Sequence, residues 1–405
     1  MKRVVVTGLG MINSLGLDKE SAFSAIVEGK CGIRKIESFD TEGQSVHIAG
    51  EIPNFDVSEV LDRKEAKKAD RFIQLGLKAA NEAMKDANLP EDTDMDRFGV
   101  ASGSGIGGLP NIEKNSVVCK NKAPRRISPF FIPSSLVNML GGFISIYQGL
   151  KGPNLSSVTA CAAGTHAIGE AAKSIMVGTA DKMLVIGAES AICPVGIGGF
   201  AAMKALSTRN DDPQTASRPF DAGRDGFVMG EGAGALVLES YDDAVARGAR
   251  IYGELIGFGE SGDANHITTP TMDGPFRAMK GAYKMAGEPK IDYVNAHGTS
   301  TPVNDKNETA ALKELMGGAE NCPPMSSIKG QIGHCLGAAG AIEAVVCLMA
   351  MRDGVLPPTI NAETADENCD LDYVNTGARK AEINVAMSNS FGFGGTNGVV
   401  IFKKV

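Results

Sequence analysis

The chain has 405 residues and a mass of 42.2 kDa, which at about 100–200 residues per domain predicts two or three compact units. Hydrophobic residues make up 43% and charged residues 22%, a balance that excludes disordered and fibrous proteins. The net charge of −8 argues against a general nucleic-acid or acidic-membrane binder. Any basic docking surface must therefore be local.

Cysteine usage and apolar stretches indicate where the protein works. The eight cysteines contain no C-x-x-C pair, and the chain is too large for a disulfide scaffold, so we expect a reducing cytoplasm. Met1-Lys-Arg leads directly into Val4–Val6, which leaves no room for a signal peptide. The uncharged stretch 127–150 contains prolines and polar residues. We therefore expect it to be buried soluble structure, with no membrane insertion.

Short apolar runs alternate with helical patterns, which predicts an α/β fold with largely buried strands. Apolar residues recur at helical spacing between Asp70 and Asn88, and Asp70 can cap that helix. The expected strands are Arg3–Gly8, Phe98–Ser102, Met183–Gly187, Ala235–Leu238, Tyr293–Ala296, Met325–Lys329, Ile383–Ser388 and Gly398–Phe402.

A faint internal repeat predicts two similar halves. The run at 4–10 (VVVTGLG) matches that at 253–259 (GELIGFG), and each half later has a helix of small residues, at 161–177 and 335–351. We assign residues 1–248 to the first half, which carries a large insertion, and residues 249–405 to the second. Packing the halves face to face would place the two small-residue helices at the centre of the molecule.

Residues Gly103–Gly108 fit the G-x-G-x-x-G pattern after a strand, which leaves a dinucleotide-dependent reductase as an alternative. The match is weak because Pro110 follows at once. Lys120 and Lys122 also stand where an acidic partner for the ribose is expected.

Cys161, in TACAAGTH (159–166), follows an extended run and opens a helix of small residues. The positive end of that helix could lower the thiol pKa by about 1.5 units from about 8.5, and nearby N–H groups could form an oxyanion hole. A buried, inert cysteine is the alternative interpretation.

Two of the five histidines stand in distinctive settings. His297 ends an expected strand, where sites of α/β proteins collect. His334 precedes the second central helix, at the position that corresponds to Cys161 in the first half. If the halves pack as predicted, Cys161 and His334 approach each other. The spacing of the three residues fits no structural zinc pattern, so we expect no metal.

Together these motifs resemble the β-ketoacyl-[acyl-carrier-protein] synthases of the thiolase superfamily, and within them the synthase II group. Two residues depart from the usual pattern of this family. Gly330 follows Lys329 where the family usually has Ser or Thr, and Asn265 stands where the family commonly has an aromatic residue. The matching segments are TACAAGTHA (159–167), ALSTRND (205–211), SRPFD (217–221), RDGFVMGEGAG (224–234), VNAHGTSTP (294–302), GHCLGAAGA (333–341) and NSFGFGGTN (389–397).

The resemblance implies a thiolase-like, five-layer αβαβα homodimer that elongates fatty acyl chains on acyl carrier protein without a cofactor. Cys161 would hold the acyl group, and malonyl-carrier protein would lose carbon dioxide to give an enolate bound by His297 and His334. Lys329 and Glu343 would support the histidines. The N–H groups of Cys161 and Phe391 would receive the tetrahedral oxyanion.

The resemblance also implies binding residues. Thr299 and Thr301 would bind the pantetheine arm, Phe391 would gate the acyl pocket, and Ile106 and Phe200 would line it. Phe131 and Ile132 would reach the pocket of the partner subunit. Carrier-protein docking would use the basic residues Lys64, Lys67, Lys68, Arg125, Arg126 and Lys204.

Three related activities compete with this interpretation. A synthase I-type enzyme of the same family has a glycine-rich version of the region around Ile106. A thiolase acting on free coenzyme A would be expected to carry a second active-site cysteine late in the chain, and none follows Cys369. A non-catalytic chain-length partner would lack the nucleophile that Cys161 provides.

Overall fold

A computed structural model describes all residues 1–405. Its main sheet has ten strands in the order β10-β9-β13-β14-β8-β1-β7-β6-β4-β5. The strands of the first half are β1 (Val4–Ile12), β4 (Phe98–Gly103), β5 (Asn154–Ser157), β6 (Lys182–Glu189) and β7 (Gly232–Ser240). Those of the second half are β8 (Gly253–Gly262), β9 (Tyr293–Asn295), β10 (Met325–Ser326), β13 (Val385–Gly392) and β14 (Thr396–Lys403).

The two halves have the same topology. If the five strands of each half are numbered in chain order, both sets of neighbours read third, second, fourth, fifth, first. In both halves the first strand pairs antiparallel with the fifth and the fifth with the fourth, while the remaining pairs are parallel. The expected internal duplication is therefore confirmed at the level of strand order, whereas the boundary at 248/249 stays a prediction.

Helices cover and separate the two halves. They are α1 (Lys19–Val27), α2 (Arg71–Ala87), α3 (Leu109–Asn121), α4 (Phe131–Ser135), α5 (Met139–Gln148), α6 (Ala163–Met176), α7 (Pro194–Ala202), α8 (Tyr241–Ala246), α9 (Asp273–Met285), α10 (Pro302–Met316), α11 (Lys329–Ile332) and α12 (Ala339–Asp353). Short strands β2 (Arg34–Lys35) with β3 (Ile48–Ala49), and β11 (Val355–Leu356) with β12 (Arg379–Lys380), form two small ribbons. None of the helices is long and apolar enough to cross a membrane.

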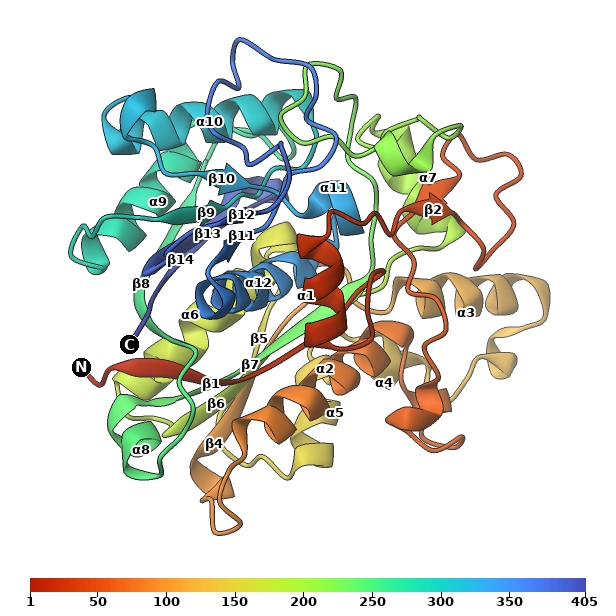
Figure 1. Ribbon diagram of the computed structural model, residues 1–405. Helices are drawn as coiled ribbons and strands as arrows, with labels where there is room; N and C mark the ends of the chain where they lie inside the picture. The colour runs from red at the N-terminus through yellow and green to blue at the C-terminus, as the bar shows by residue number, and fades with distance from the viewer.

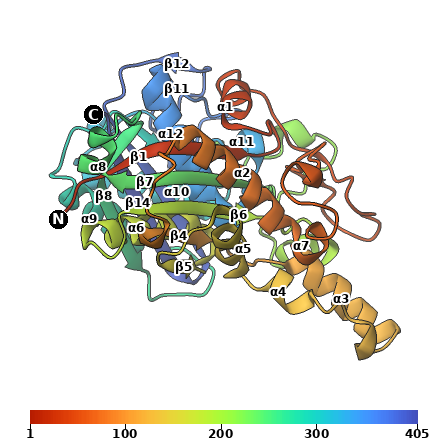
Figure 2. The same cartoon turned by 90° about the horizontal axis from the view of Figure 1, so that it is seen from below.

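These elements form five layers, as expected. Helices α6 and α12 lie at the centre and contact strands of both halves (Figure 1). Helices α2 and α5 cover the outer face of the first half, and α9, with α10 packed on it, covers the outer face of the second. Seen from below, α2 crosses the strands of the first half, and α3 extends away from the body of the molecule (Figure 2).

Sequence reasoning located most element ends to within four residues, and two expectations need correction. Asp70 caps α2 as predicted, but the expected strand Met325–Lys329 ends at Ser326. The chain turns there because the Ser327 hydroxyl donates to the carbonyl of Gly298 and accepts from the N–H of Lys329 (2.6 and 3.2 Å), which starts α11. The stretch 127–150 is not fully buried, since Ile132 and Ile146 are 57% and 75% exposed.

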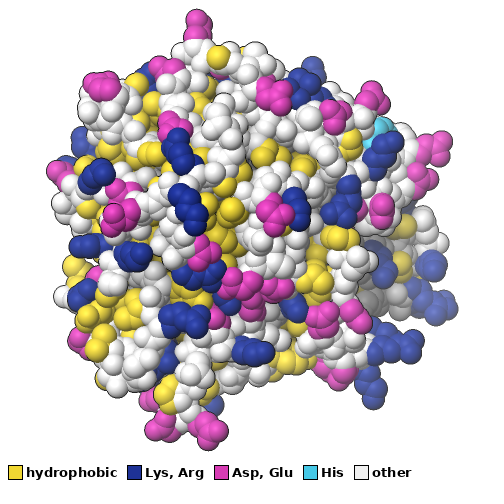
Figure 3. Space-filling model, in the orientation of Figure 1, with side chains coloured by type: hydrophobic (Ala, Val, Ile, Leu, Met, Phe, Trp, Pro, Cys, Tyr) yellow, Lys and Arg dark blue, Asp and Glu magenta, His cyan; other side chains and the backbone are white.

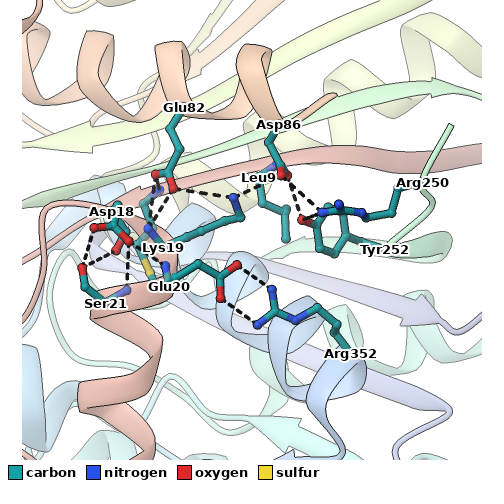
Figure 4. Close-up of polar contacts among 11 residues, drawn as sticks. Leu9, Asp18, Lys19, Glu20, Ser21, Glu82, Asp86, Arg250, Tyr252 and Arg352 are labelled. Carbon is teal, nitrogen blue, oxygen red and sulfur yellow. Dashed lines mark hydrogen bonds and ion pairs between the residues drawn. The ribbon is translucent and has the colours of Figure 1, made fainter. Parts of the chain in front are cut away.

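A polar cluster joins the two halves at the C-terminal end of α2. Glu82 and Asp86, one helical turn apart, both face the ammonium group of Lys19 on α1, at 3.6 and 3.1 Å (Figure 4). The Tyr252 hydroxyl, from the second half, donates to Asp86 at 2.8 Å. Lys19 is only 7% exposed, so its charge compensates two partly buried carboxylates.

We predict that Lys19→Ala lowers the free energy of unfolding by about 3 kcal/mol, because it leaves Glu82 and Asp86 without their buried cation. Urea unfolding measures the change. Lys85→Ala, at an exposed position of the same helix, serves as the control and should cost no more than about 0.5 kcal/mol. Equal effects of the two substitutions would contradict a stabilising role for the cluster.

Candidate active site

A cavity of about 620 Å³ opens between the two halves and collects most of the predicted site residues. Its wall includes Cys161 and Ile106 from the first half, and His297, His334 and Phe391 from the second. Strand ends and the loops that follow them supply four of these side chains, and His334 follows α11. A second cavity, of about 850 Å³, lies beside α3 and contains none of the predicted catalytic side chains.

Cys161 lies in a turn of 3-10 helix, Ala160–Ala162, directly before α6. Ala160 has a φ of +48°, a backbone conformation that is unfavourable for a residue with a side chain. The surrounding structure must therefore hold this turn. Gly392 lies against it so closely that a Cβ there would come within 3.2 Å of the Cys161 nitrogen. The expected drop in the thiol pKa is wrong. Burial raises the pKa of the Cys161 thiol to about 12, although the positive charge of Lys329 opposes this effect.

His297 and His334 lie next to each other, with ring centroids 5.3 Å apart and ring planes nearly perpendicular. Both are almost completely buried. Burial, reinforced by the positive charge of Lys329, lowers the pKa of each ring well below its usual value near 6.5. Both Nδ1 atoms are buried without a hydrogen-bond partner, so Nε2 is the ring nitrogen left to serve the cavity. At neutral pH the site therefore contains two uncharged imidazoles.

Lys329 and Glu343 form a fully buried pair behind the histidines. The Lys329 ammonium donates to the Glu343 carboxylate and, at 2.5 Å, to the backbone carbonyl of His297. Burial raises the pKa of the Glu343 carboxyl to about 7, and the lysine charge counteracts the increase. The pair thus fixes the His297 backbone and places a positive charge near both rings, which disfavours their protonation.

The sequence analysis missed Glu308, a buried carboxylate on α10. Its two oxygens accept hydrogen bonds from the backbone N–H groups of His297 and Gly298, each at 2.8 Å. The Asn389 side chain donates to it at 3.0 Å. Gly298 has a φ of +37°, so the chain bends sharply after His297 and both N–H groups point toward Glu308. The only signal in the sequence was an acidic residue six positions after the start of α10, the helix that follows His297.

His166 was also missed as a structural element of the site. Its Nε2 donates to the carbonyl of Asn397 at 3.2 Å, so Nδ1 accepts from the Thr159 hydroxyl at 2.6 Å. The Thr396 hydroxyl donates to the carbonyl of Thr159 at 3.0 Å. These bonds connect the turn that carries Cys161 to the first two residues of β14, which directly follow the glycine-rich segment 392–395.

The remaining predicted residues divide into two groups. Thr299 and Thr301 line the cavity with hydroxyl oxygens 2.9 Å apart, and Ile106, Phe200 and Lys204 also line it. Phe391 lies 5.5 Å from His297 between ring centroids. The other group lies outside the cavity of this subunit and comprises Phe131, Ile132, Lys64, Lys67, Lys68, Arg125 and Arg126.

The glycine-rich loop after β4 is already occupied by a side chain of the protein. The N–H groups of residues 105–107 all donate to the carboxylate of Glu189, at 2.6, 3.1 and 3.0 Å. These are the donors that a bound pyrophosphate would need. The dinucleotide-binding alternative is therefore wrong for this loop. Glu189 is a third residue that the sequence analysis missed.

The departure at Gly330 has a packing explanation. A Cβ at this position would lie 3.0 Å from the Cγ1 atom of Ile360 and 3.2 Å from its carbonyl oxygen. Ile360 thus fills the space that a Ser or Thr side chain would need. Asn265 does not line the cavity, whereas its neighbours Asp263 and His266 do.

We predict that Glu308→Gln lowers the free energy of unfolding by about 1–3 kcal/mol, because the new amide turns a donor toward one of two buried backbone N–H groups. Chemical unfolding gives the value. Glu314→Gln, at an exposed position of the same helix, should change it by no more than about 0.5 kcal/mol. A Glu308 variant as stable as the Glu314 control would show that the carboxylate does not hold the His297 turn.

Similarity to known proteins agrees with this geometry. The β-ketoacyl synthase N-terminal domain profile matches residues 1–244, and the C-terminal domain profile matches residues 252–363. The chain is 49% identical over 409 residues to 3-oxoacyl-[acyl-carrier-protein] synthase 2 of Coxiella burnetii, covering 100% of this chain and 99% of that one. It is 50% identical over 408 residues to the protein of the same name from Staphylococcus aureus strain N315, covering 100% and 98%.

Solved structures give the same result. A β-ketoacyl synthase from Burkholderia phymatum superposes with a TM-score of 0.94 at 36% identity, covering all of both chains. A type II polyketide ketosynthase, solved in complex with its acyl-carrier protein, superposes at 0.91 with 35% identity, again over all of both chains. With both domain profiles matched in order and half of its residues shared with full-length relatives, the chain belongs to the β-ketoacyl synthase family.

Proposed function

We propose that this enzyme joins a fatty acyl group held on Cys161 to the carbon released from malonyl-acyl-carrier protein, giving 3-oxoacyl-carrier protein and carbon dioxide, as a synthase II. The observation that carries the proposal is the convergence of Cys161 with two neutral, adjacent imidazoles in one cavity between the halves. The names of the relatives support the same substrates and the synthase II group.

In the first step the Cys161 sulfur attacks the acyl thioester. A new carbon–sulfur bond forms, the old one breaks, and the carrier's thiol leaves with the proton that Cys161 loses. Burial keeps the Cys161 thiol protonated at rest, so it needs a base while it attacks. The base is a neutral ring whose Nε2 is unprotonated in this step, and the same ring must have its proton on Nε2 before the second step. Backbone N–H groups of Cys161 and Phe391 are suited to the developing oxyanion.

In the second step malonyl thioester loses its carboxylate. The carbon–carbon bond breaks, carbon dioxide departs, and the electron pair moves onto the thioester as an enolate. Neutral His297 and His334 can each donate an N–H to the enolate oxygen. Donors that meet this charge only as it develops stabilise the transition state more than the bound substrate. Lys329 and Glu343 assist by keeping the rings neutral and in place.

In the third step the enolate carbon attacks the acyl-Cys161 carbonyl. A carbon–carbon bond forms, the bond to sulfur breaks, and the released Cys161 thiolate takes up a proton from solvent. Ile106 and Phe200 line the space for the acyl chain, and the hydroxyls of Thr299 and Thr301 bind the pantetheine arm. Phe391 closes the acyl pocket, and its glycine neighbours permit the motion. No cofactor takes part in this scheme.

The enzyme acts as a homodimer in this proposal, with Phe131 and Ile132 reaching the partner's cavity. Supporting this, α4, α5 and edge strand β5 present exposed apolar side chains, including Ile132 (57%), Ile146 (75%) and Leu155 (37%). An edge strand also offers unpaired backbone groups to a second copy. Exposed apolar side chains on neighbouring elements are typical of an interaction site.

Acyl carrier protein docks on basic side chains near the dimer face. Lys64 and Lys67 are exposed, Lys68 stacks 5.6 Å above the Phe130 ring, and Arg125 and Arg126 precede that ring in the chain. Lys and Arg side chains gather along the edge of the molecule where α3 lies (Figure 3). Lys204 stands apart, at the rim of the cavity. A cytoplasmic location suits this partner, and all eight cysteines are free.

The nucleophile is tested by Cys161→Ala, which should abolish condensation and keep the fold, because a small residue still fits the turn. Intact-mass spectrometry of the unaltered enzyme with acyl-carrier protein should show one acyl adduct, located on Cys161. Cys193→Ala, at a buried cysteine outside the cavity, is the matched control and should keep the adduct. An adduct on another cysteine would remove the assignment.

The histidines should be separable from the cysteine. We expect His297→Ala and His334→Ala to retain some acylation of Cys161 and to lose release of carbon dioxide from malonyl-carrier protein. In the unaltered enzyme the rate of this release should stay level from pH 8 down to about pH 6.5, because the ring pKa values are lowered below the ordinary 6.5. Normal decarboxylation in both variants, or a titration midpoint between pH 7 and 8, would argue against the role.

For docking, Lys64→Glu combined with Lys67→Glu should impair turnover of carrier-protein substrates more than that of pantetheine thioesters. The defect should shrink as salt rises, since the Debye length falls from about 10 Å at 0.1 M to about 3 Å at 1 M. Lys280→Glu with Lys284→Glu, exposed on α9, makes the same charge change elsewhere. Equal losses for both double variants would place the docking surface elsewhere.

A further inference from the structure

Glu189 is a buried carboxylate at the end of β6 that the scheme above does not use. One oxygen accepts from the Ser104 hydroxyl at 2.8 Å and from two of the loop N–H groups described above. The other accepts from the third loop N–H group and from the N–H of Gly337, at 2.6 and 3.1 Å. Every partner is a donor, and no cation pairs with it.

The donors belong to two loops from different halves of the protein. The first loop, after β4, carries Ile106; the second, Leu336–Ala338, carries Leu336, and both of these side chains line the cavity. The loops touch closely, since a Cβ on Gly337 would lie 2.2 Å from the Gly105 nitrogen and 2.8 Å from a Glu189 oxygen. The carboxylate is therefore enclosed at the junction of two cavity walls.

This arrangement gives the carboxylate control over the width of the cavity. Its four backbone bonds are lost or weakened if either loop moves, and buried N–H groups without an acceptor are strongly disfavoured. A short acyl group on Cys161 needs little of the wall, whereas a long chain must run along Ile106 and Leu336. The position of these two side chains therefore affects long chains more than short ones.

We propose that Glu189 is the positioning residue that sets acyl-chain selectivity, because it fixes Ile106 and Leu336 on the wall of the acyl cavity from two halves of the chain. The inference rests on the proposed function, in which Cys161 carries the acyl chain. The glycine-rich loop is thus an anion-binding turn whose anion is supplied by the protein itself.

The test compares Glu189→Gln with Glu239→Gln. Glu239 is equally buried, but its partners Thr7, Lys182 and Arg247 do not line the cavity. Acylation of Cys161 by carrier proteins loaded with graded chains is followed by intact mass. For Glu189→Gln we expect the ratio of kcat/KM for a long chain to that for acetyl to fall about 10-fold, mainly through KM. Glu239→Gln should lower stability and leave the ratio unchanged.

A milder variant covers the case in which Glu189→Gln does not fold. Ser104→Ala removes one of the five donors and should lower the same ratio about threefold. Uniform slowing at all chain lengths in Glu189→Gln, or in Ser104→Ala if only that variant folds, would overturn the inference. Failure of the proposed function looks different, because the unaltered enzyme would then acquire no acyl group on Cys161.

Discussion

The close approach of helices α6 and α12 is the constraint on which the site depends. A Cβ on Gly164 would lie 2.8 Å from the Ala341 nitrogen, and one on Gly340 would lie 2.1 Å from the Thr165 hydroxyl oxygen. Side chains larger than hydrogen at these two positions would push the helices apart. Because Cys161 precedes one helix and His334 the other, this contact brings nucleophile and imidazole to the same cavity. Protein interiors are packed densely enough for such a displacement to be transmitted.

The fold was largely readable from the sequence because its signals are local and repeated. Alternating apolar runs gave most of the strands, and Asp70 marked the start of α2 at the observed residue. The repeat was detectable because both halves keep a strand, a helix of small residues and a second strand in the same order. Lys329 was misplaced in a strand because the turn before it depends on Ser327 bonding to Gly298, 29 residues away. Such a contact leaves no periodic pattern in the sequence.

The candidate site was predictable where function fixes residue type, and it was not predictable where a buried side chain supports the backbone of another segment. Cys161, His297 and His334 lie in motifs, and the structure brings them into one cavity. Glu189 and Glu308 lie in no motif that was recognised, and the segments they hold are 82–148 and 10–11 residues away along the chain. The thiol pKa was misjudged for a related reason. A helix end is visible in a sequence, whereas the burial that raises the pKa to about 12 arises only on folding.

Three buried glutamates explain how a chain with 50 glycines, each with a conformationally free backbone, forms a fixed site. Glu308 holds the His297 turn, Glu189 holds the walls near Cys161, and Glu343 holds Lys329. An isolated buried carboxylate is costly, but one that accepts several N–H bonds is stable and resists any displacement of its donors. Glycine is needed beside Glu189 because a Cβ on Gly105 would lie 2.9 Å from the carboxylate. The glycines thus allow backbone N–H groups to reach Glu189 and Glu308, and these two carboxylates in turn restrict the glycines.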